Sequence, residues 1–463
     1  MIPNLSDTIC AIATPSGVGA IAIIRISGKS SHEIIKNIFT PSKKGSKYPE
    51  MWRLYYGEIF EKENFIDDVL VAYFPASASY TGEESVEISC HGSLFIQNKI
   101  IELIISKGAR MAEAGEFTLR SFVNGKMDLI KAEAVDDVIQ SRTSVAHNLA
   151  VKQMRGNYQY KIKELRQQLI DLKALLELEI DFSEEDVEFA DRTLLRNLCQ
   201  NLLDEINLLT ESFKTGNNIK DGIPVVIAGE PNVGKSTLLN AILCEERAIV
   251  SNIPGTTRDY IEDTIIINNV LFRFIDTAGL RNTSDPIEAA GVERSIALTS
   301  NAAIVLLLFD ASNCNSKLIN DNIEQLKTKI PDIDFNKVLI IVNKTDLNPN
   351  INKYLAIPNN IKTVFISAKN KENIEFLLNE LLDLTNLSDY NQNIILSNVR
   401  HYNEFMIIKE LMEETISHID TNHSQDIISS FLHKALHHIG LITGEVSNED
   451  VLYSIFSKFC IGK

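Results

Sequence analysis

The stretch Gly229-Glu230-Pro231-Asn232-Val233-Gly234-Lys235-Ser236 decides the fold of the central part of this chain. It follows an apolar, β-branched run from Ile223 to Ala228 and precedes Thr237 to Ala241, a run that favours a helix. In a strand, glycine-rich turn and helix of this kind, backbone N–H groups and the helix dipole bind a chain of phosphates. We expect Lys235 to neutralise the β- and γ-phosphates and the hydroxyl of Ser236 to ligate Mg2+. The alternative is a chance turn of the same composition, which the motifs downstream disfavour.

Two later motifs identify the base as guanine. Asn343-Lys344-Thr345-Asp346 follows an apolar run from Val338 to Val342, and Asp346 can accept hydrogen bonds from N1–H and the exocyclic amine of guanine. Adenine has no such pair of donors, so its binding would leave the carboxylate unpaired. Ser367-Ala368-Lys369 follows a strand expected from Thr363 to Ile366, where a second base-contacting loop belongs. The motifs predict a Ras-like P-loop GTPase domain with a mostly parallel sheet.

The segments expected to sense the γ-phosphate lie between these motifs. Asp276-Thr277-Ala278-Gly279 ends an expected strand, so Asp276 would hold Mg2+ through water and Gly279 would bind the γ-phosphate. Gly255-Thr256-Thr257-Arg258-Asp259 stands where a switch loop belongs. Leu280 occupies the position at which Ras-like proteins have a glutamine that orients the attacking water. Hydrolysis therefore needs another arrangement or is slow, and the polar candidates just beyond are Arg281, Asp285 and Glu288.

Asn232, inside the phosphate loop, has two equally supported interpretations. It is a candidate ligand of a monovalent cation, which would supply the positive charge that an arginine finger provides in other GTPases. Alternatively, it only shapes the turn.

The bulk composition bounds the class of protein. The chain has 463 residues, a length typical of about three domains. Hydrophobic residues make up 44% and charged residues 23%, as in soluble globular proteins. No apolar run reaches the roughly 18 residues that a membrane span needs, and the N-terminus lacks a signal-like core, so we expect a cytoplasmic protein with no membrane partner. The net charge of −17 disfavours strong unaided binding of nucleic acid. Any RNA is then bound locally or delivered by a basic partner.

Six scattered cysteines form no Cys-x-x-Cys pair, which favours reduced thiols and argues against a zinc finger. The chain ends Phe459-Cys460-Ile461-Gly462-Lys463, which fits a prenylation box poorly. Cys460 is equally well interpreted as an accessible thiol beside cationic Lys463 or as a buried small hydrophobe. His433, His437 and His438 could suggest a metal site, but no carboxylate partner is evident and a plain exposed helix is favoured.

The pattern divides the chain into four segments. Residues 1–122 are predicted to be an α+β domain, 123–219 and 385–463 helical, and 220–384 the GTPase domain. The simplest interpretation is one helical domain into which the GTPase domain is inserted, because insertion is tolerated where the termini of the guest domain lie close together.

Several blocks together resemble one family. The phosphate loop, Gly255 to Asp259, Asp276 to Arg281 and the Cys460 tail are similar to those of the MnmE (TrmE) family of tRNA modification GTPases, within the TrmE-Era-EngA-like superfamily. The likeness extends to Gly19–Gly28, to Tyr80–Glu83 and to Ala114–Thr118. It covers essentially the whole chain. The GTPase motifs are widely shared, whereas the tail and the N-terminal blocks are specific.

This resemblance implies a cellular role. A flavin-dependent partner of the MnmG (GidA) family, which alone carries FAD, would join the chain in a heterotetramer. Together they would build an aminomethyl or carboxymethylaminomethyl substituent on C5 of the wobble uridine, position 34, of certain tRNAs. The N-terminal domain would form a homodimer and bind 5-formyltetrahydrofolate or a related tetrahydrofolate as one-carbon donor. GTP hydrolysis would drive conformational change when two GTPase domains pair.

The resemblance also implies roles for individual residues. Folate would contact Arg25, Glu87, Lys126 and Lys463, near Cys460, which modification requires. K+ would replace the arginine finger and be held by Asn232, Ser251, Ile253 and Thr256, while Ser236 and Thr257 would serve Mg2+. Glu288 would orient the attacking water, and Pro286 lies two residues before it. The GTP-binding set would be Asn232, Val233, Gly234, Lys235, Ser236, Thr237, Thr256, Thr257, Asp276, Gly279, Asn343, Lys344, Asp346, Ser367, Ala368 and Lys369.

Two other classes of protein share parts of this pattern. A ribosome-assembly GTPase would carry a basic RNA-binding module, which we do not find, and would give Cys460 no purpose. A pure regulatory switch without modification chemistry is compatible with the sequence. Binding of folate would distinguish both classes from a modification enzyme.

Overall fold

The computed structural model describes residues 5–43, 50–181, 192–243, 248–250, 262–276, 298–300, 302–331, 333–358, 361–385, 394–421, 423–446 and 449–462. These residues form two compact units. The first comprises residues 1–139, 150–204 and 404–463, and the second residues 140–149 and 205–403, within the described ranges.

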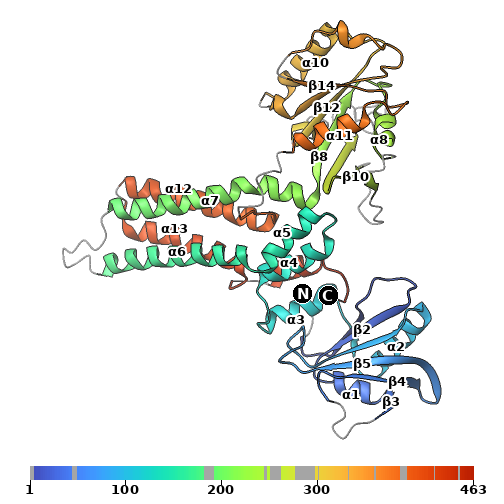
Figure 1. Ribbon diagram of the computed structural model, residues 1–463. Coiled ribbons are helices and arrows are strands. Elements are labelled where there is room, and N and C mark those ends of the chain that lie inside the picture. The colour runs from blue at the N-terminus through green and yellow to red at the C-terminus, as the bar shows by residue number, and fades with distance from the viewer. Residues whose placement is uncertain are drawn as a thin grey trace, which may run out of the picture. The chain divides into compact units, whose positions relative to one another are not determined.

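The first unit begins with a seven-stranded sheet in the order β3-β4-β5-β6-β2-β1-β7 (Figure 1). Its strands are β1 (Ile9–Ile12), β2 (Ile21–Ser27), β3 (Phe39–Pro41), β4 (Leu54–Glu61), β5 (Asn64–Phe74), β6 (Ser85–His91) and β7 (Arg110–Met111). One face packs against α1 (Ser31–Lys36) and α2 (Leu94–Ser106). Alternating residues of the strands, among them Ile24, Val71 and Ile88, are fully buried and form this core.

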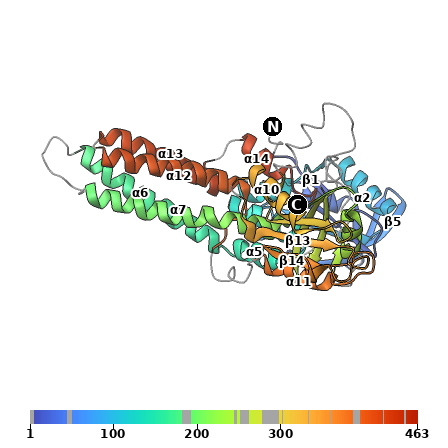
Figure 2. The ribbon, with the colours of Figure 1, turned by 90° about the horizontal axis from the view of Figure 1, so that it is seen from above.

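The helices of the first unit follow the apolar spacing of the sequence. They are α3 (Glu116–Val123), α4 (Leu129–Gln140), α6 (Asn157–Asp181), α13 (Gln425–Thr443) and α14 (Glu449–Phe456), with parts of α5 (Ser144–Met154), α7 (Arg192–Asp221) and α12 (Val399–Asp420). Leu165, Leu169 and Leu172 of α6 are buried, as their spacing predicts, and α6 packs along α13. Figure 2 shows α6 and α13 side by side, as does Figure 1. No helix among the described residues combines the length and apolarity of a membrane span.

The second unit holds a seven-stranded sheet in the order β14-β13-β12-β8-β11-β10-β9. Its elements are β8 (Ile223–Gly229), α8 (Lys235–Leu243), β9 (Ala248–Val250), β10 (Glu262–Ile267), β11 (Val270–Asp276), β12 (Ile304–Asp310), α10 (Ser316–Lys329), β13 (Val338–Asn343), β14 (Lys362–Phe365) and α11 (Ile374–Asp383). Five strands are parallel, and β10 and β9 extend the sheet in antiparallel fashion. The predicted Ras-like architecture with a mostly parallel sheet is thus confirmed.

Candidate functional site

The phosphate loop has the backbone geometry that the motif requires. Gly229 and Gly234 have positive φ angles of +154° and +99°. A Cβ at Gly229 would lie 2.6 Å from the carbonyl O of Leu308, and one at Gly234 would lie 2.4 Å from Nδ2 of Asn343. Only glycine fits both positions without displacing a neighbour. The Lys235 side chain folds back over the loop, where Nζ donates to the carbonyls of Gly229 at 2.8 Å and Glu230 at 3.1 Å.

Asn343 joins three of the predicted motifs. It is 2% exposed; its Nδ2 donates to the carbonyl O of Val233 at 2.9 Å, and its Oδ1 accepts from the N–H of Ala368 at 3.0 Å. The sequence predicted Asn343 only as a member of the GTP-binding set, whereas these contacts show that it links the loops of Asp346 and Ala368 to the phosphate loop. The three loops meet because they follow the carboxyl ends of parallel strands in one sheet.

Lys344 makes a second connection to the phosphate loop. Its Nζ donates to the carbonyl O of Asn232 at 2.8 Å and pairs with Oδ2 of Asp310 at 2.6 Å. Burial raises the pKa of the Asp310 carboxyl, but the hydrogen bonds from Lys344 and Ser312 outweigh it and hold the pKa below its usual range. Sequence analysis missed Asp310, although its place at the end of β12 is a usable signal.

Asp346, the residue expected to recognise guanine, is oriented by the next motif. Its Oδ1 accepts from Oγ of Ser367 at 2.6 Å, and Lys369 follows on the same loop. At the other end of the site, Ser236 and Thr237 lie in the first turn of α8 and are exposed, as is Asn232, whose φ is +65°. Their hydroxyl and amide groups are thus accessible to a nucleotide and its ions.

Several predicted residues lie outside the described part of the chain. These are Ser251, Ile253, Thr256, Thr257, Gly279, Leu280, Glu288 and Lys463, together with the side chain of Asp276. Their roles in hydrolysis, ion binding and folate binding stay predictions.

The N-terminal sheet carries the predicted Arg25 and Glu87 as a pair. Arg25 donates from Nε to Oε1 of Glu87 at 2.9 Å, across neighbouring strands β2 and β6. The rings of Tyr80 and Phe117 lie 5.5 and 5.7 Å from the guanidinium carbon. Aromatic faces at this distance stabilise a cation and hold its orientation. Lys126, on the turn after α3, donates from Nζ to the carbonyl O of Ser77 at 2.7 Å.

A buried ion network lies under this part of the domain, and the sequence did not reveal it. The Glu116 and Arg120 side chains expose 0% and 1% of their surface and pair at 2.8 Å. Glu116 also pairs with Arg110 at 2.8 Å, and Arg120 pairs with Glu83 at 3.1 Å. Burial alone would raise the pKa of the Glu116 carboxyl, but the hydrogen bonds from Arg110, the Glu113 N–H and Arg120 lower it.

Cys460 is the exposed member among the cysteines that the structure describes. Burial raises the pKa of Cys10 and Cys199 to about 12, and that of Cys90 and Cys314 to about 11. These four thiols stay protonated at neutral pH. Of the two interpretations left open by the sequence, the accessible thiol is therefore the one observed.

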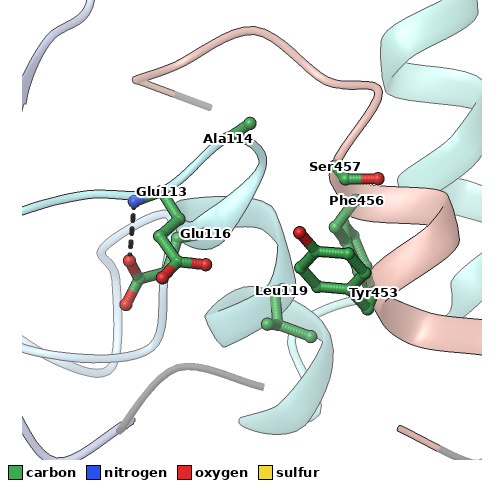
Figure 3. Close-up of a pocket in the computed structure, with 7 residues that line it drawn as sticks. All are labelled: Glu113, Ala114, Glu116, Leu119, Tyr453, Phe456 and Ser457. Atoms are coloured by element: carbon green, nitrogen blue, oxygen red, sulfur yellow. Dashed lines mark hydrogen bonds between the residues drawn. The ribbon is translucent and has the colours of Figure 1, made fainter. Parts of the chain in front are cut away.

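The tail that carries Cys460 lies on the N-terminal domain. The N–H of Gly115 donates to the carbonyl O of Cys460 at 3.4 Å, and Ala114 forms an antiparallel bridge with Ile461. Beside this contact is a pocket of about 330 Å³. Figure 3 shows its lining between the turn before α3 and the end of α14: Glu113, Ala114, Glu116, Leu119, Tyr453, Phe456 and Ser457.

The histidines of α13 do not form a metal site with described residues. Among these residues, no cluster of three or more His, Cys, Asp or Glu side chains could hold an ion. We expected these histidines to have no carboxylate partner. That expectation is wrong, because Nδ1 of His438 lies 2.6 Å from Oε2 of Glu404 on α12. The two residues are distant in sequence, so spacing along one helix could not reveal the pair.

Comparison with known proteins extends over the whole chain. The family described as MnmE helical domain matches residues 129–460, and the family described as GTP-binding protein TrmE N-terminus matches residues 8–126. The tRNA modification GTPase MnmE of Flavobacterium johnsoniae is 47% identical over 99% of both chains. Proteins of the same name from Christiangramia forsetii and Bacteroides fragilis are 45% and 46% identical over 99% of this chain and 100% and 99% of theirs.

Solved structures match less extensively. Era from Aquifex aeolicus is 25% identical over 41% of this chain and 66% of its own, with a TM-score of 0.27, too low to support a structural argument. The family matches and the full-length relatives are decisive: the chain belongs to the MnmE family of tRNA modification GTPases.

Proposed function

We propose that this chain is a K+-activated GTPase that acts with a flavin-dependent partner of the MnmG (GidA) family to modify C5 of the wobble uridine in certain tRNAs. The substituent is of the aminomethyl or carboxymethylaminomethyl type, and its carbon comes from a tetrahydrofolate one-carbon unit. One observation carries the proposal. Within a chain of this family, guanine-nucleotide loops occur together with an exposed thiol whose tail lies on the N-terminal domain.

In the GTPase domain, we assign nucleotide binding to the residues predicted from the sequence. Lys235 and the N–H groups of its loop bind phosphates, Ser236 and Thr257 serve Mg2+, and Asp346 binds guanine. Asn232, Ser251, Ile253 and Thr256 hold K+, and Glu288 orients the attacking water. The exposed position of Asn232 at the mouth of the loop supports its part in this assignment. A cation at the transferring phosphates stabilises charge that develops in the transition state.

In the N-terminal domain, we assign folate binding to Arg25, Glu87, Lys126 and Lys463. Carboxylates suit the amino edge of a pterin, and cations suit the anionic tail of folate. Cys460 takes part in the modification step, with FAD carried only by the partner. We assign residues 1–122 to the folate-binding and dimerisation domain, 220–384 to the GTPase domain, and 123–219 with 385–463 to the helical domain.

A homodimer through the N-terminal sheet is supported by its exposed face. Opposite α1 and α2, the side chains of Ile21, Leu54, Tyr56, Phe65 and Leu70 are 39% to 65% exposed. Tyr56 and Leu70 lie opposite each other on neighbouring strands, so apolar side chains are adjacent on this face, as they are at association surfaces. Two such chains with two partner chains form the proposed heterotetramer.

The first experiment measures GTP turnover by the purified chain in K+ and in Na+ at matched ionic strength. We expect K+ to accelerate hydrolysis by about tenfold or more, because the proposed site holds K+ and not the smaller Na+ beside the transferring phosphates. Asn232→Ala should remove the difference between the two salts. Equal rates in both salts would contradict the cation site and favour a GTPase that needs an outside activator.

A further inference from the structure

We propose that the turn from Glu113 to Glu116 is a seat that fixes the Cys460 thiol relative to the Arg25–Glu87 pair. Gly115 and Glu116 are its positioning residues. The inference rests on the proposed function, in which the thiol and the pair act in tRNA modification. The inference goes further by naming the residues that hold the thiol and the pair in fixed positions, and the contacts through which they do so.

Contacts on both sides of Cys460 hold the tail. Phe459 is buried in a cluster with Leu119 and Phe456, so the chain enters the seat from an apolar anchor. Ile461 forms the bridge with Ala114. After it, Gly462 has a φ of +96°, and a Cβ there would lie 2.4 Å from the carbonyl O of Ile12. The backbone around Cys460 is therefore fixed while its side chain stays exposed.

Gly115 lies where the backbones of the turn and the tail are in contact. Its φ is +67°, and its N–H donates to the carbonyl O of Cys460. A Cβ at Gly115 would lie 2.4 Å from the carbonyl O of Phe456, a backbone atom that a side-chain rotation does not remove. Any larger residue at this position must push the end of α14, and with it the tail, off the turn.

Glu116 anchors the turn to the core of the domain. Its carboxylate accepts the N–H of Glu113 at 2.9 Å, which closes the turn, as the dashed line in Figure 3 marks. The same carboxylate holds the buried Arg120, whose Nη1 donates to the carbonyl O of Asp7 at 2.7 Å. Because these groups are withdrawn from water and paired, the turn has one stable arrangement.

The helix that starts at this seat also supports the Arg25 guanidinium. Phe117 places its ring 5.7 Å from the guanidinium carbon, and Thr118 lies 2.9 Å, oxygen to oxygen, from the Tyr80 hydroxyl. The Tyr80 ring in turn lies 5.5 Å from Arg25. Consecutive residues from Gly115 to Thr118 thus contact the tail on one side and the aromatic support of Arg25 on the other.

The first test measures whether Gly115 seats the tail, without reference to activity. In the full chain with Cys460→Ser, the substitutions Ala114→Cys and Ile461→Cys put two thiols on a bridged pair, at a separation suited to a disulfide. Peptide mapping after mild oxidation gives the rate of disulfide formation. Adding Gly115→Ala should slow it about tenfold, as expected for an overpacked contact.

Gly125→Ala is the matched control, because Gly125 has a φ of +69° and no heavy atom within 4 Å of a Cβ placed there. It introduces the same backbone strain without the collision, so its trapping rate should equal that of the parent. Equal trapping rates in the Gly115→Ala and parent chains would overturn the proposal. So would an equal loss in both glycine variants, since strain alone would then explain it.

The second test uses the chain with its native Cys460 and its flavin-dependent partner. Gly115→Ala should lower the rate of tRNA modification about tenfold and leave GTP hydrolysis within about twofold, whereas Gly125→Ala should change neither. Full modification by Gly115→Ala would overturn the positioning role. If the unsubstituted chain modifies no tRNA, the proposed function fails, and the trapping rates still decide whether the turn seats the tail.

Discussion

The hydrogen bond between Ser367 and Asp346 bears on the proposed recognition of guanine. Ser367 donates to one carboxylate oxygen at 2.6 Å, so the orientation of Asp346 is set before any base arrives. We expect Asp346→Asn to lower GTP affinity by about 100-fold, because an amide cannot accept from both guanine donors. Competition among GTP, ATP and ITP measures this loss of affinity. Asp383→Asn, at the exposed end of α11, is the control. A variant that remains strictly selective for GTP would contradict the base-recognition role.

Cys460 should separate the two activities of the chain. Its thiol is exposed and lies outside the GTPase unit, so Cys460→Ser should leave GTP hydrolysis near normal while tRNA modification is lost. Mass spectrometry of digested tRNA measures the modification, and phosphate release measures hydrolysis in the same preparation. If both activities survive, the thiol serves only the structure.

At the scale of elements, the turn before α3 should be sensitive to acid. The pKa of Glu116 is lowered in the folded state, so its contribution is present above about pH 4.3, the ordinary value for a glutamate, and is lost as pH falls through the folded pKa. Glu116→Gln should cost about 3 kcal/mol at pH 7, since it removes one of the two carboxylate partners of the buried Arg120 guanidinium.

Urea unfolding of the full chain between pH 3 and pH 7 measures this prediction. The difference in unfolding free energy between the parent and Glu116→Gln should shrink towards the acid end. Glu113→Gln changes an exposed carboxylate on the same turn and should follow the parent at every pH. A constant difference between Glu116→Gln and the parent would mean that the charge of Glu116 contributes nothing.

The elements also show how far the sequence alone could predict the structure. The strands and loops of the nucleotide site followed from motifs, because a phosphate loop imposes its own strand, turn and helix. The network around Glu116 did not, since its members come from β7, α3 and two loops, and nothing in local spacing links Asp7 or Glu83 to Arg120. Likewise, the exposure of Cys460 depends on contacts with Ala114 and Gly115, which only the folded chain brings near.

At the scale of the whole molecule, the two units hold different parts of the proposed function. The described nucleotide loops belong to the second unit, and the Arg25–Glu87 pair with the Cys460 tail belongs to the first. Residues of α7 and α12 belong to both units, so each of these helices is a continuous covalent link between them. In the proposed function, a conformational change on GTP hydrolysis would be passed to the first unit along these two helices.

The bridge between Ala114 and Ile461 also has a consequence for biosynthesis. At 5–20 residues per second, a ribosome needs roughly 20 to 70 seconds to go from the first of these residues to the second. Through that interval the nascent N-terminal domain lacks Phe459 and Ile461, which in the folded chain pack with Leu119 and pair with Ala114. A translating chain therefore lacks Cys460 until the tail emerges, and a prematurely terminated chain would lack the thiol of the proposed modification step even if its sheet had folded.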